Sequence, residues 1–492
     1  MTDKSPILLW LRQDLRLADN AALNWAARQG PVVPLYIWDE DGEDPFPPGG
    51  ASKWWLAEAL KDLSEAFEKL GAPLILRRGE PKQVLESLIA ETGATSITWN
   101  KSYEPFACAR DNHLIEFFEK KGLIIKPHSG FLLFEPGSIK TGAGTPFKVF
   151  TPFSKACFAA KTPEKPEAAP SKLQSMAGIK TDDLKNWNLV PKKATWPEGL
   201  KAAWTPGEKA AHQHLRNFID KALDSYQKGR DRPDKNHTSR LSSYLHFGHI
   251  SPKQVWHAIQ YAVAKTPSLG SHAERYLLEI LWREFSWHLL SHIPNLPTEP
   301  LNKSFSQFPW KKDEKGLKAW QRGMTGYPIV DAGMRQLWQT GWMHNRVRMI
   351  AASFLIKDLL IDWREGAAWF WDTLVDADLG NNTASWQWVA GCGADASPYF
   401  RIFNPTLQGE KFDPDGDYVR QFVPELAKLD RQFIHQPWKA PQKALKEAGI
   451  ILGTTYPNPI IDHGKARERA LTALKSTKSN ASQAAEIKGF FD

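Results

Sequence analysis

The first 130 residues alternate short apolar runs with longer stretches in which apolar residues recur every three or four positions. The short runs predict β-strands at Ile7–Leu11, Val32–Trp38, Pro73–Leu76, Ser96–Trp99 and Leu123–Ile125. The longer stretches predict helices at 20–29, 52–70, 82–91 and 107–121. Because strands that alternate with helices are typical of a parallel sheet with right-handed crossovers, we expect an α/β domain over residues 5–130.

The pattern changes twice further along the chain. Periodicity fades between about residues 130 and 205, where Thr162–Pro170 has the proline-rich composition of a linker. After Pro206 the pattern is helical almost to the end, with few strand signals. We therefore expect a connector over 131–205 and a larger all-helical domain over 206–480.

Composition narrows the class of protein. With 42% hydrophobic and 24% charged residues, the 492-residue chain has the composition of a globular protein. No apolar run is long enough to span a bilayer, and the first residues lack a signal-peptide pattern, so we expect a cytoplasmic protein without a membrane partner. Cys108, Cys157 and Cys392 have neither metal-site nor disulfide spacing, and no metal is expected. The net charge of +8 favours an anionic partner, most commonly nucleic acid.

Two features of the sequence give no functional prediction on their own. No G-x-G-x-x-G follows the first strand, and the nearest approximation to that motif, residues 391–396, follows no clear strand. We interpret it as a chance match. The chain also has 22 tryptophans. Large rings usually serve packing, and Trp54 and Trp55 are interpreted in this way.

A hydroxyl-rich segment, Thr238–Ser243, precedes the apolar stretch 244–250. Hydroxyls at a helix start cap free N–H groups, and such N–H groups together with Arg240 would suit a phosphate. An ordinary helix cap without a ligand is the alternative.

A second candidate lies on one helix face, where Glu279, Trp282, Arg283 and Ser286 fall at positions i, i+3, i+4 and i+7. An acid, a ring and a cation together suit a concave binding site. The alternative is the boundary of an amphipathic helix with a Glu–Arg pair.

A third candidate is the segment Gly341–Met349, which opens an apolar helix predicted to run to about Leu360. Asn345, Arg348 and Met349 share one face, and an arginine this close to an apolar run needs a buried acid. His344 is interpreted as a structural histidine rather than a base. The acids and amides of 376–382 form either part of a site or a turn.

Several long segments, in the same order, resemble the photolyase/cryptochrome family. They are Ile7–Leu17, Thr238–Ser242, Glu279–Phe285, Thr325–Met349, Asp376–Asn382 and Phe400–Pro405. The resemblance covers residues from about 5 to 475, and it is strongest to bacterial class I cyclobutane pyrimidine dimer photolyases. It implies an N-terminal Rossmann-like α/β antenna domain, a long connector and a C-terminal helical domain that binds FAD and DNA.

The resemblance also implies residue roles at matched positions. FAD would be held by Tyr226, Thr238, Ser239, Arg240, Leu241, Ser242, Trp282, Arg283, Asn345, Arg348, Asp376, Ala377, Asp378 and Asn382. Within this set, Arg348 would pair with Asp376, and Asn382 would face flavin N5. Trp386, Trp363 and Trp310 match the family's electron-transfer chain from the flavin to the surface, although packing is the alternative for each ring.

On the substrate side, the matched positions imply contacts with damaged DNA. The residues are Arg230, Glu279, Trp282, Arg346, Trp388, Gln408 and Lys411. Trp282 would stack on a flipped-out base and Glu279 would hydrogen-bond the dimer, with Asn345 and Met349 beside it. The implied activity is light-driven splitting of cyclobutane pyrimidine dimers in DNA, by electron transfer from photoexcited reduced FAD. We expect a monomeric lyase without an obligate protein partner, associated with the nucleoid through DNA.

Three other classes of protein compete with this prediction. A six-four photoproduct lyase is expected to carry His at the positions of Asn345 and Met349. A cryptochrome-type photoreceptor often has Asp or Cys in place of Asn382 and a long C-terminal extension. A basic helical protein that uses flavin structurally would not need Glu279, Trp282 and Met349 together. The antenna stays open between a deazaflavin, methenyltetrahydrofolate bound in a different way, and none, because Phe106 and Ala107 stand where folate-type relatives carry Asn-Glu.

Overall fold

The computed structural model describes residues 5–40, 42–396 and 400–488. Its N-terminal part contains a five-stranded sheet in the order β3-β2-β1-β4-β5, in which every neighbouring pair is parallel. The strands are β1 (Ile7–Leu11), β2 (Val32–Trp38), β3 (Ile75–Arg78), β4 (Ser96–Asn100) and β5 (Ile124–His128). The central strands β1 and β4 are buried along their whole length, as expected for a parallel sheet covered on both faces. The predicted fold class is therefore confirmed.

The crossover helices of this part are α1 (Ala21–Gln29), α2 (Gly50–Lys69), α3 (Pro81–Thr92) and α4 (Pro105–Lys120). Their ends follow local chemistry. The Glu80 side chain accepts hydrogen bonds from the first free N–H groups of α3, and Gly93 ends that helix in the left-handed conformation. Proline at the first position starts α4 two residues earlier than predicted. The third strand begins at Ile75 rather than at Pro73.

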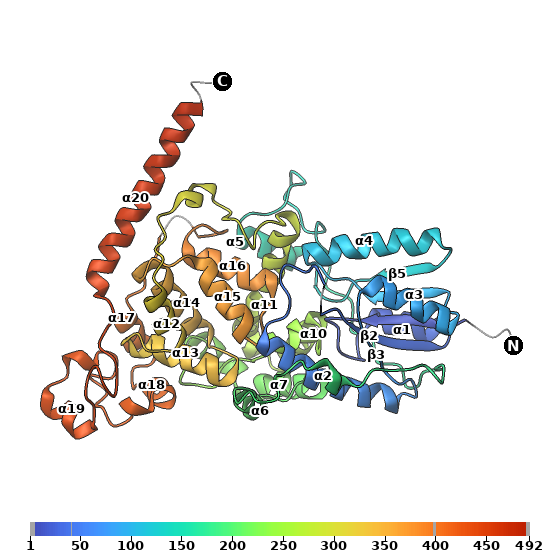
Figure 1. Cartoon of the computed structure of the whole chain (residues 1–492), viewed down its shortest axis with the longest axis horizontal. Coiled ribbons are helices and arrows are strands. Elements are labelled where there is room, and N and C mark those ends of the chain that lie inside the picture. The colour runs from blue at the N-terminus through green and yellow to red at the C-terminus, as the bar shows by residue number, and fades with distance from the viewer. Residues whose placement is uncertain (1–4, 41, 397–399, 489–492) are drawn as a thin grey trace.

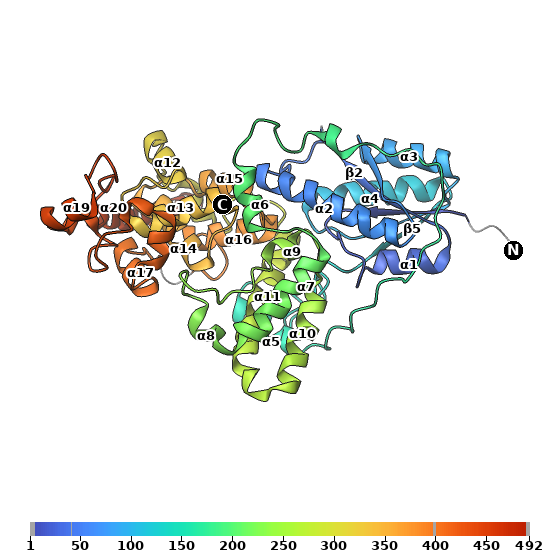
Figure 2. The ribbon, with the colours of Figure 1, turned by 90° about the horizontal axis from the view of Figure 1, so that it is seen from below.

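The connector between residues 130 and 205 has more structure than the sequence suggested. It contains α5 (Phe150–Ala159), the 3-10 turn η1 (Leu184–Trp187) and α6 (Pro197–Ala203). Phe150, Phe153 and Cys157 lie on the buried side of α5. Since α5 packs against α11, the connector contributes to the helical half of the molecule (Figure 2).

The remainder of the chain is helical, as predicted, and lies opposite the α/β part in Figure 1. Its elements are α7 (Glu208–Lys221), η2 (Leu223–Ser225), α8 (Tyr226–Gly229), α9 (Ser242–His246), α10 (Pro252–Lys265), η3 (Pro267–Leu269), α11 (Gly270–His292), η4 (Lys303–Gln307), α12 (Glu314–Gln321), α13 (Pro328–Thr340), α14 (Asn345–Ser353), η5 (Phe354–Asp358), α15 (Trp363–Thr373), α16 (Leu379–Ala390), α17 (Pro405–Phe412), α18 (Asp417–Phe422), η6 (Pro424–Leu426), η7 (Pro437–Lys439), α19 (Gln442–Ala448) and α20 (His463–Lys488). In the part of the chain that the structure describes, no helix is long and apolar enough to cross a membrane.

The predicted helix from Gly341 to Leu360 is interrupted. Regular α-helix ends at Ser353, and η5 continues it as a turn of π-helix. Leu360 then adopts a left-handed φ of 58°. A π-turn shifts the side chains that follow it relative to those before it, which the apolar pattern alone cannot reveal.

Two buried contacts join the sheet to the helical half. The guanidinium of Arg16, 1% exposed, donates to the carbonyl of Gly248 at 2.9 Å. The indole N–H of Trp55 lies 2.9 Å from Nε2 of His249. Trp54 and Trp55 are both buried, which agrees with their interpretation as packing residues.

Candidate functional site

The loop between α8 and α9 carries the first group of expected cofactor contacts. Arg240 has a left-handed φ of 52°, and its guanidinium carbon lies 4.8 Å from the ring centre of Trp342. Ser239 Oγ accepts a hydrogen bond from the hydroxyl of Tyr276 at 3.1 Å. The ring of Tyr226 is buried close to the same tyrosine, at 5.4 Å between ring centres.

The expected capping of α9 by these hydroxyls is wrong. Leu241, not a hydroxyl residue, occupies the N-cap position, and no side chain caps the helix. Ser239 Oγ instead lies 3.4 Å from the backbone N of Leu241, Thr238 is half-buried and Ser242 is exposed. Thr238 and Ser239 therefore belong to the loop, and Ser242 begins α9 without capping it.

Arg348 and Asp376 form the ion pair that the sequence predicted. Nη2 of Arg348 lies 2.8 Å from Oδ2 of Asp376, whose side chain is 3% exposed. Nε of the same arginine donates to the carbonyl of Met343 at 2.7 Å, which fixes its orientation. Ala377 is buried next to this acid.

Asp378 links three elements. Its Oδ1 accepts from the backbone N–H of Asn381 at 2.8 Å and so caps α16, and its Oδ2 accepts from the indole N–H of Trp287 on α11 at 3.1 Å. His246 Nδ1 lies 4.0 Å from Oδ2. Burial lowers the pKa of His246, an effect that outweighs the neighbouring carboxylates, so the imidazole is neutral at pH 7. Asn382 Nδ2 donates to the carbonyl of Ala367 at 3.1 Å.

Polar atoms around these contacts lack partners. Arg240 Nε, His246 Nδ1 and Asp376 Oδ1 are buried and make no hydrogen bond within the described residues. Other unsatisfied buried atoms are spread over the described residues, as at Trp10 and Trp99, but these three belong to the expected cofactor contacts or their immediate neighbours and are available to a ligand. A cation, a neutral imidazole and a carboxylate suit a ligand with phosphates and a hydrogen-bonding ring system. These residues fit FAD.

The three tryptophans of the expected electron path sit on separate elements. Trp386 on α16 is 3% exposed, Trp363 at the start of α15 is 2% exposed, and Trp310, before α12, is half-buried. A Cβ added at Gly366 would lie 2.1 Å from the ring of Trp386, so only glycine lets α15 approach α16 this closely. Trp320 and Phe370 also contact Trp386, at 6.2 and 4.9 Å between ring centres.

On the substrate side, three of the residues expected to meet DNA, namely Arg230, Glu279 and Arg346, are held in ion pairs. Glu279 on α11 accepts a hydrogen bond from Arg230 and lies 3.6 Å from Arg275. Arg346 pairs with Asp231 at 2.9 Å. Arg275 and Asp231 were not singled out from the sequence, because a charged residue on a polar helix or loop gives no local signal of its partner.

Arg283 lies apart from the other residues of its predicted face. It is buried, donates to the carbonyl of Phe131 at 3.1 Å and pairs with Glu284 at 3.2 Å. Glu284 in turn accepts the backbone N–H groups of Leu133 and Phe134, and burial raises its pKa to about 7. This pair fastens the connector to α11.

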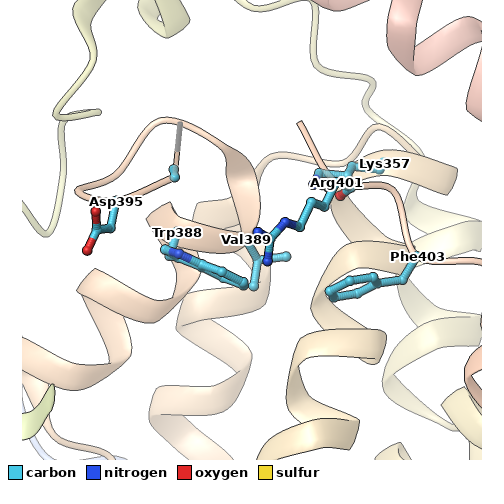
Figure 3. A pocket seen from close by; sticks show the side chains of 7 residues that line it. Lys357, Trp388, Val389, Asp395, Arg401 and Phe403 are labelled. Atoms are coloured by element: carbon cyan, nitrogen blue, oxygen red, sulfur yellow. Dashed lines mark hydrogen bonds between the residues drawn. The ribbon is translucent and has the colours of Figure 1, made fainter. Parts of the chain in front are cut away.

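A small pocket lies beside the end of α16 (Figure 3). It is lined by Lys357, Trp388, Val389, Asp395, Ala396, Arg401 and Phe403. The guanidinium carbon of Arg401 is 5.9 Å from the ring centre of Trp388. Lys357 donates to the carbonyl of Arg401, and burial lowers the pKa of its amine to about 7. The structure therefore places Trp388 at the edge of a cationic pocket.

The remaining predicted residues lie on α14 and α17. Asn345 is exposed at the start of α14, and Met349 is half-buried one turn later. His344 caps that helix, with Nδ1 accepting from the backbone N–H of Arg346 at 3.2 Å. Burial lowers the pKa of His344 to about 4, which agrees with a structural role. Gln408 is half-buried on α17, and Lys411 is exposed there.

A parallel sheet joined to a helical half, with polar groups around Arg240, His246 and Asp376 that are available to a ligand, fits the class of proteins that bind a nucleotide cofactor. Comparison with known proteins shows to which family within that class the chain belongs. The family model for DNA photolyase matches residues 7–171, and the model for the FAD-binding domain of DNA photolyase matches residues 276–476. The chain belongs to the photolyase/cryptochrome family, and its cofactor is FAD.

Similar proteins come from both branches of the family. The chain is 53% identical to a deoxyribodipyrimidine photo-lyase of Agrobacterium fabrum, over 96% of this chain and 98% of that protein. It is 38% identical to Cryptochrome-2 of Arabidopsis thaliana, over 97% of this chain and 79% of that protein. A crystal structure of a bacterial class III photolyase from Agrobacterium tumefaciens superposes with a TM-score of 0.93 at 52% identity, covering 97% of this chain and 99% of that one.

Proposed function

We propose that this protein is a deoxyribodipyrimidine photo-lyase that splits cyclobutane pyrimidine dimers in UV-damaged DNA under blue or near-UV light. The 53% identity to a photo-lyase along nearly the whole chain supports this activity. One structural observation carries the proposal. Helix α11 bears Glu279 and Trp282 toward the proposed substrate side, and Trp287 on the same helix binds the Asp378 carboxylate on the proposed cofactor side. A single rigid element thus connects the two sites.

Each residue has a defined task in this proposal. Arg240, Arg348, Asp376 and Asp378, with Tyr226 and the loop 238–242, bind and orient FAD. Reduced FAD held by these residues would lend the dimer an electron after light is absorbed and would take it back once both ring bonds have reopened. Glu279 donates a hydrogen bond to the dimer, a contact that strengthens as negative charge develops on the pyrimidine carbonyl. Asn382 offers an amide without a charge near the flavin, and Trp386, Trp363 and Trp310 carry electrons from the surface.

DNA binding in the proposal combines phosphate contacts with base stacking. Arg230, Arg346, Gln408 and Lys411 meet the damaged strand, and Trp282 and Trp388 meet the flipped-out pyrimidines.

The protein acts as a cytoplasmic monomer without an obligate protein partner. We further propose the division into an antenna domain (5–130), a connector (131–205) and a helical domain (206–480). The 52% identity to a class III photolyase favours class III over the class I relationship expected from the sequence.

The substrate class follows from α14. Asn345 can hydrogen-bond a pyrimidine without delivering a proton, and Met349 offers a soft apolar contact. Cyclobutane splitting needs no delivered proton, whereas six-four repair must move a hydroxyl or amino group and calls for an acid such as His. Incubation of the illuminated, reduced protein with oligonucleotides that carry each lesion tests this. We expect turnover of the cyclobutane lesion alone, and turnover of only the six-four lesion would overturn the assignment.

A cryptochrome-type photoreceptor is the second candidate, because the chain is also 38% identical to a plant cryptochrome. Absence of repair of either lesion, in protein that binds FAD and responds to blue light, would favour it.

The absorption spectrum of purified protein, followed by pigment extraction, identifies the antenna chromophore.

A further inference from the structure

Trp282 is stacked from behind by a residue of the connector. The ring centres of Trp282 and Phe150 are 3.6 Å apart, and their planes differ by 9°. Phe285 meets Trp282 edge-on, at 6.0 Å and 73°. Phe150 lies at the start of α5, so this contact joins the connector to α11. A face-to-face stack of this kind fixes the orientation of the indole.

Only one face of the indole remains available. Phe150 covers one face and is itself 6% exposed, whereas Trp282 is half-buried. A second ring could therefore stack on Trp282 only on the face turned away from Phe150. A ring held in this way loses little conformational freedom when a second ring stacks on its open face.

The position of Phe150 is set by Asp395. Oδ2 of Asp395 accepts the backbone N–H of Phe150 at 2.8 Å, the first free N–H of α5. Asp395 has a left-handed φ of 57°, a conformation unfavourable for most residues other than glycine, asparagine and aspartate. Asp395 belongs to the segment 391–396, whose glycine pattern was attributed to chance, and it also lines the pocket beside Trp388 (Figure 3).

We infer that Phe150 and Asp395 are positioning residues for the base-stacking face of Trp282. Asp395 holds the start of α5, Phe150 supports the back of the indole, and Trp282 presents its other face to a flipped-out pyrimidine. The chain of contacts also connects the Trp282 platform to the pocket that contains Trp388. This inference rests on the proposed function.

The first test removes the supporting ring. Phe150→Leu keeps an apolar side chain but abolishes the stack, and Phe158→Leu, which changes a 39%-exposed ring on the same helix, serves as the matched control. Holoprotein binds an oligonucleotide with one thymine cyclobutane dimer and its undamaged counterpart. For Phe150→Leu we expect about three- to tenfold weaker binding of damaged DNA, unchanged binding of undamaged DNA and unchanged repair yield at saturation. The control should match the wild type.

The second test distinguishes the hydrogen bond that the Asp395 side chain accepts from the left-handed backbone conformation of that residue. Asn and Gly both tolerate the left-handed φ of Asp395, but only Asn retains a side-chain oxygen that can accept the N–H of Phe150. Asp395→Asn should therefore bind damaged DNA like the wild type, and Asp395→Gly should weaken it as Phe150→Leu does. This pair remains informative even if Phe150→Leu fails to fold.

The outcomes distinguish the inference from the proposed function. If the wild type itself does not prefer dimer-containing DNA, the proposed function fails. If the wild type shows that preference and neither Phe150→Leu nor Asp395→Gly reduces it, the inference alone is overturned. Equal losses of affinity for damaged and undamaged DNA would also overturn it, because a general structural role would act on both.

Discussion

Arg230 donates a hydrogen bond to the carboxylate of Glu279, so two residues proposed to meet damaged DNA are paired with each other. Their side chains are 11% and 26% exposed. Arg275, 3.6 Å from the same carboxylate, adds a second cation. The pair fixes the orientation of the Glu279 side chain on α11 and moderates its repulsion of DNA phosphates.

Replacing Glu279 should separate repair from binding. Glu279→Ala removes a contact that strengthens only as the dimer becomes negative, so repair yield per absorbed photon should fall more than affinity for DNA. Affinity should hold or rise, since Arg230 is released to bind phosphate. Glu279→Gln keeps hydrogen bonding, so its repair yield should lie between those of the wild type and Glu279→Ala. Loss of affinity with an unchanged yield would make Glu279 a docking residue.

Trp363 is the central ring of the proposed electron path. Because electron tunnelling falls steeply with distance, Trp363→Phe should block light-driven reduction of bound oxidised FAD while chemically reduced protein still repairs dimers. Trp54→Phe, at a buried tryptophan in α2, is the matched control and should photoreduce normally. Normal photoreduction of the Trp363 variant would exclude this ring from the path.

The pair of Arg348 and Asp376 should be required to retain FAD. Arg348→Ala leaves the buried carboxylate without its cation, which typically costs about 3 kcal/mol in free energy of unfolding. We expect the purified variant to lose flavin absorbance and to melt earlier. Arg431→Ala breaks an ion pair of which both side chains are more than half exposed, and it should change neither quantity. Full flavin occupancy in Arg348→Ala would contradict the assignment.

Affinity for DNA should depend on salt through individual cations. Lys411 is exposed on α17, and Lys411→Ala should lower the slope of log affinity against log salt concentration by about 1 while lesion preference is retained. Lys120→Ala, an exposed position on α4, should leave the slope unchanged. Titrations at several salt concentrations with damaged and undamaged duplexes measure both variants.

The buried amine of Lys357 should make stability depend on pH. Its pKa is lowered to about 7 by burial, whereas in the unfolded chain it keeps an ordinary value near 10.5. Between these values the unfolded chain binds one proton more, so stability rises with pH. Relative to Lys357→Met, the wild type should gain up to about 1.4 kcal/mol per pH unit above about pH 7. Denaturant unfolding at several pH values measures this, and parallel curves would contradict it.

The regular parts of the fold were predictable because their apolar patterns are local. The five strands were placed within a few residues, and the helical nature of the second half followed from its periodicity. Arg348 and Asp376 could be paired because a cation beside an apolar run requires an acid, and the family resemblance supplied one.

The remaining features depend on partners distant in the sequence. Phe150 stacks on Trp282 across 132 positions of the chain, from a connector in which the hydrophobic pattern is weak. Arg283 occupies the predicted helix face, but its side chain turns to the connector, where it donates to the carbonyl of Phe131, and it pairs with its neighbour Glu284 on the same helix. The π-turn η5 leaves the apolar pattern intact and so gives no local signal.

Gly366 couples the packing of α15 on α16 to the proposed electron transfer. Because no side chain separates the helices there, the ring of Trp386 rests directly against the backbone of α15, the helix that begins with Trp363. A change in the spacing of α15 and α16 at this contact would therefore also move Trp386 relative to the helix that carries Trp363, the next ring of the proposed electron path. Electron tunnelling falls steeply with distance. A sub-ångström shift too small to change the stability of the protein would therefore change the rate of electron transfer here.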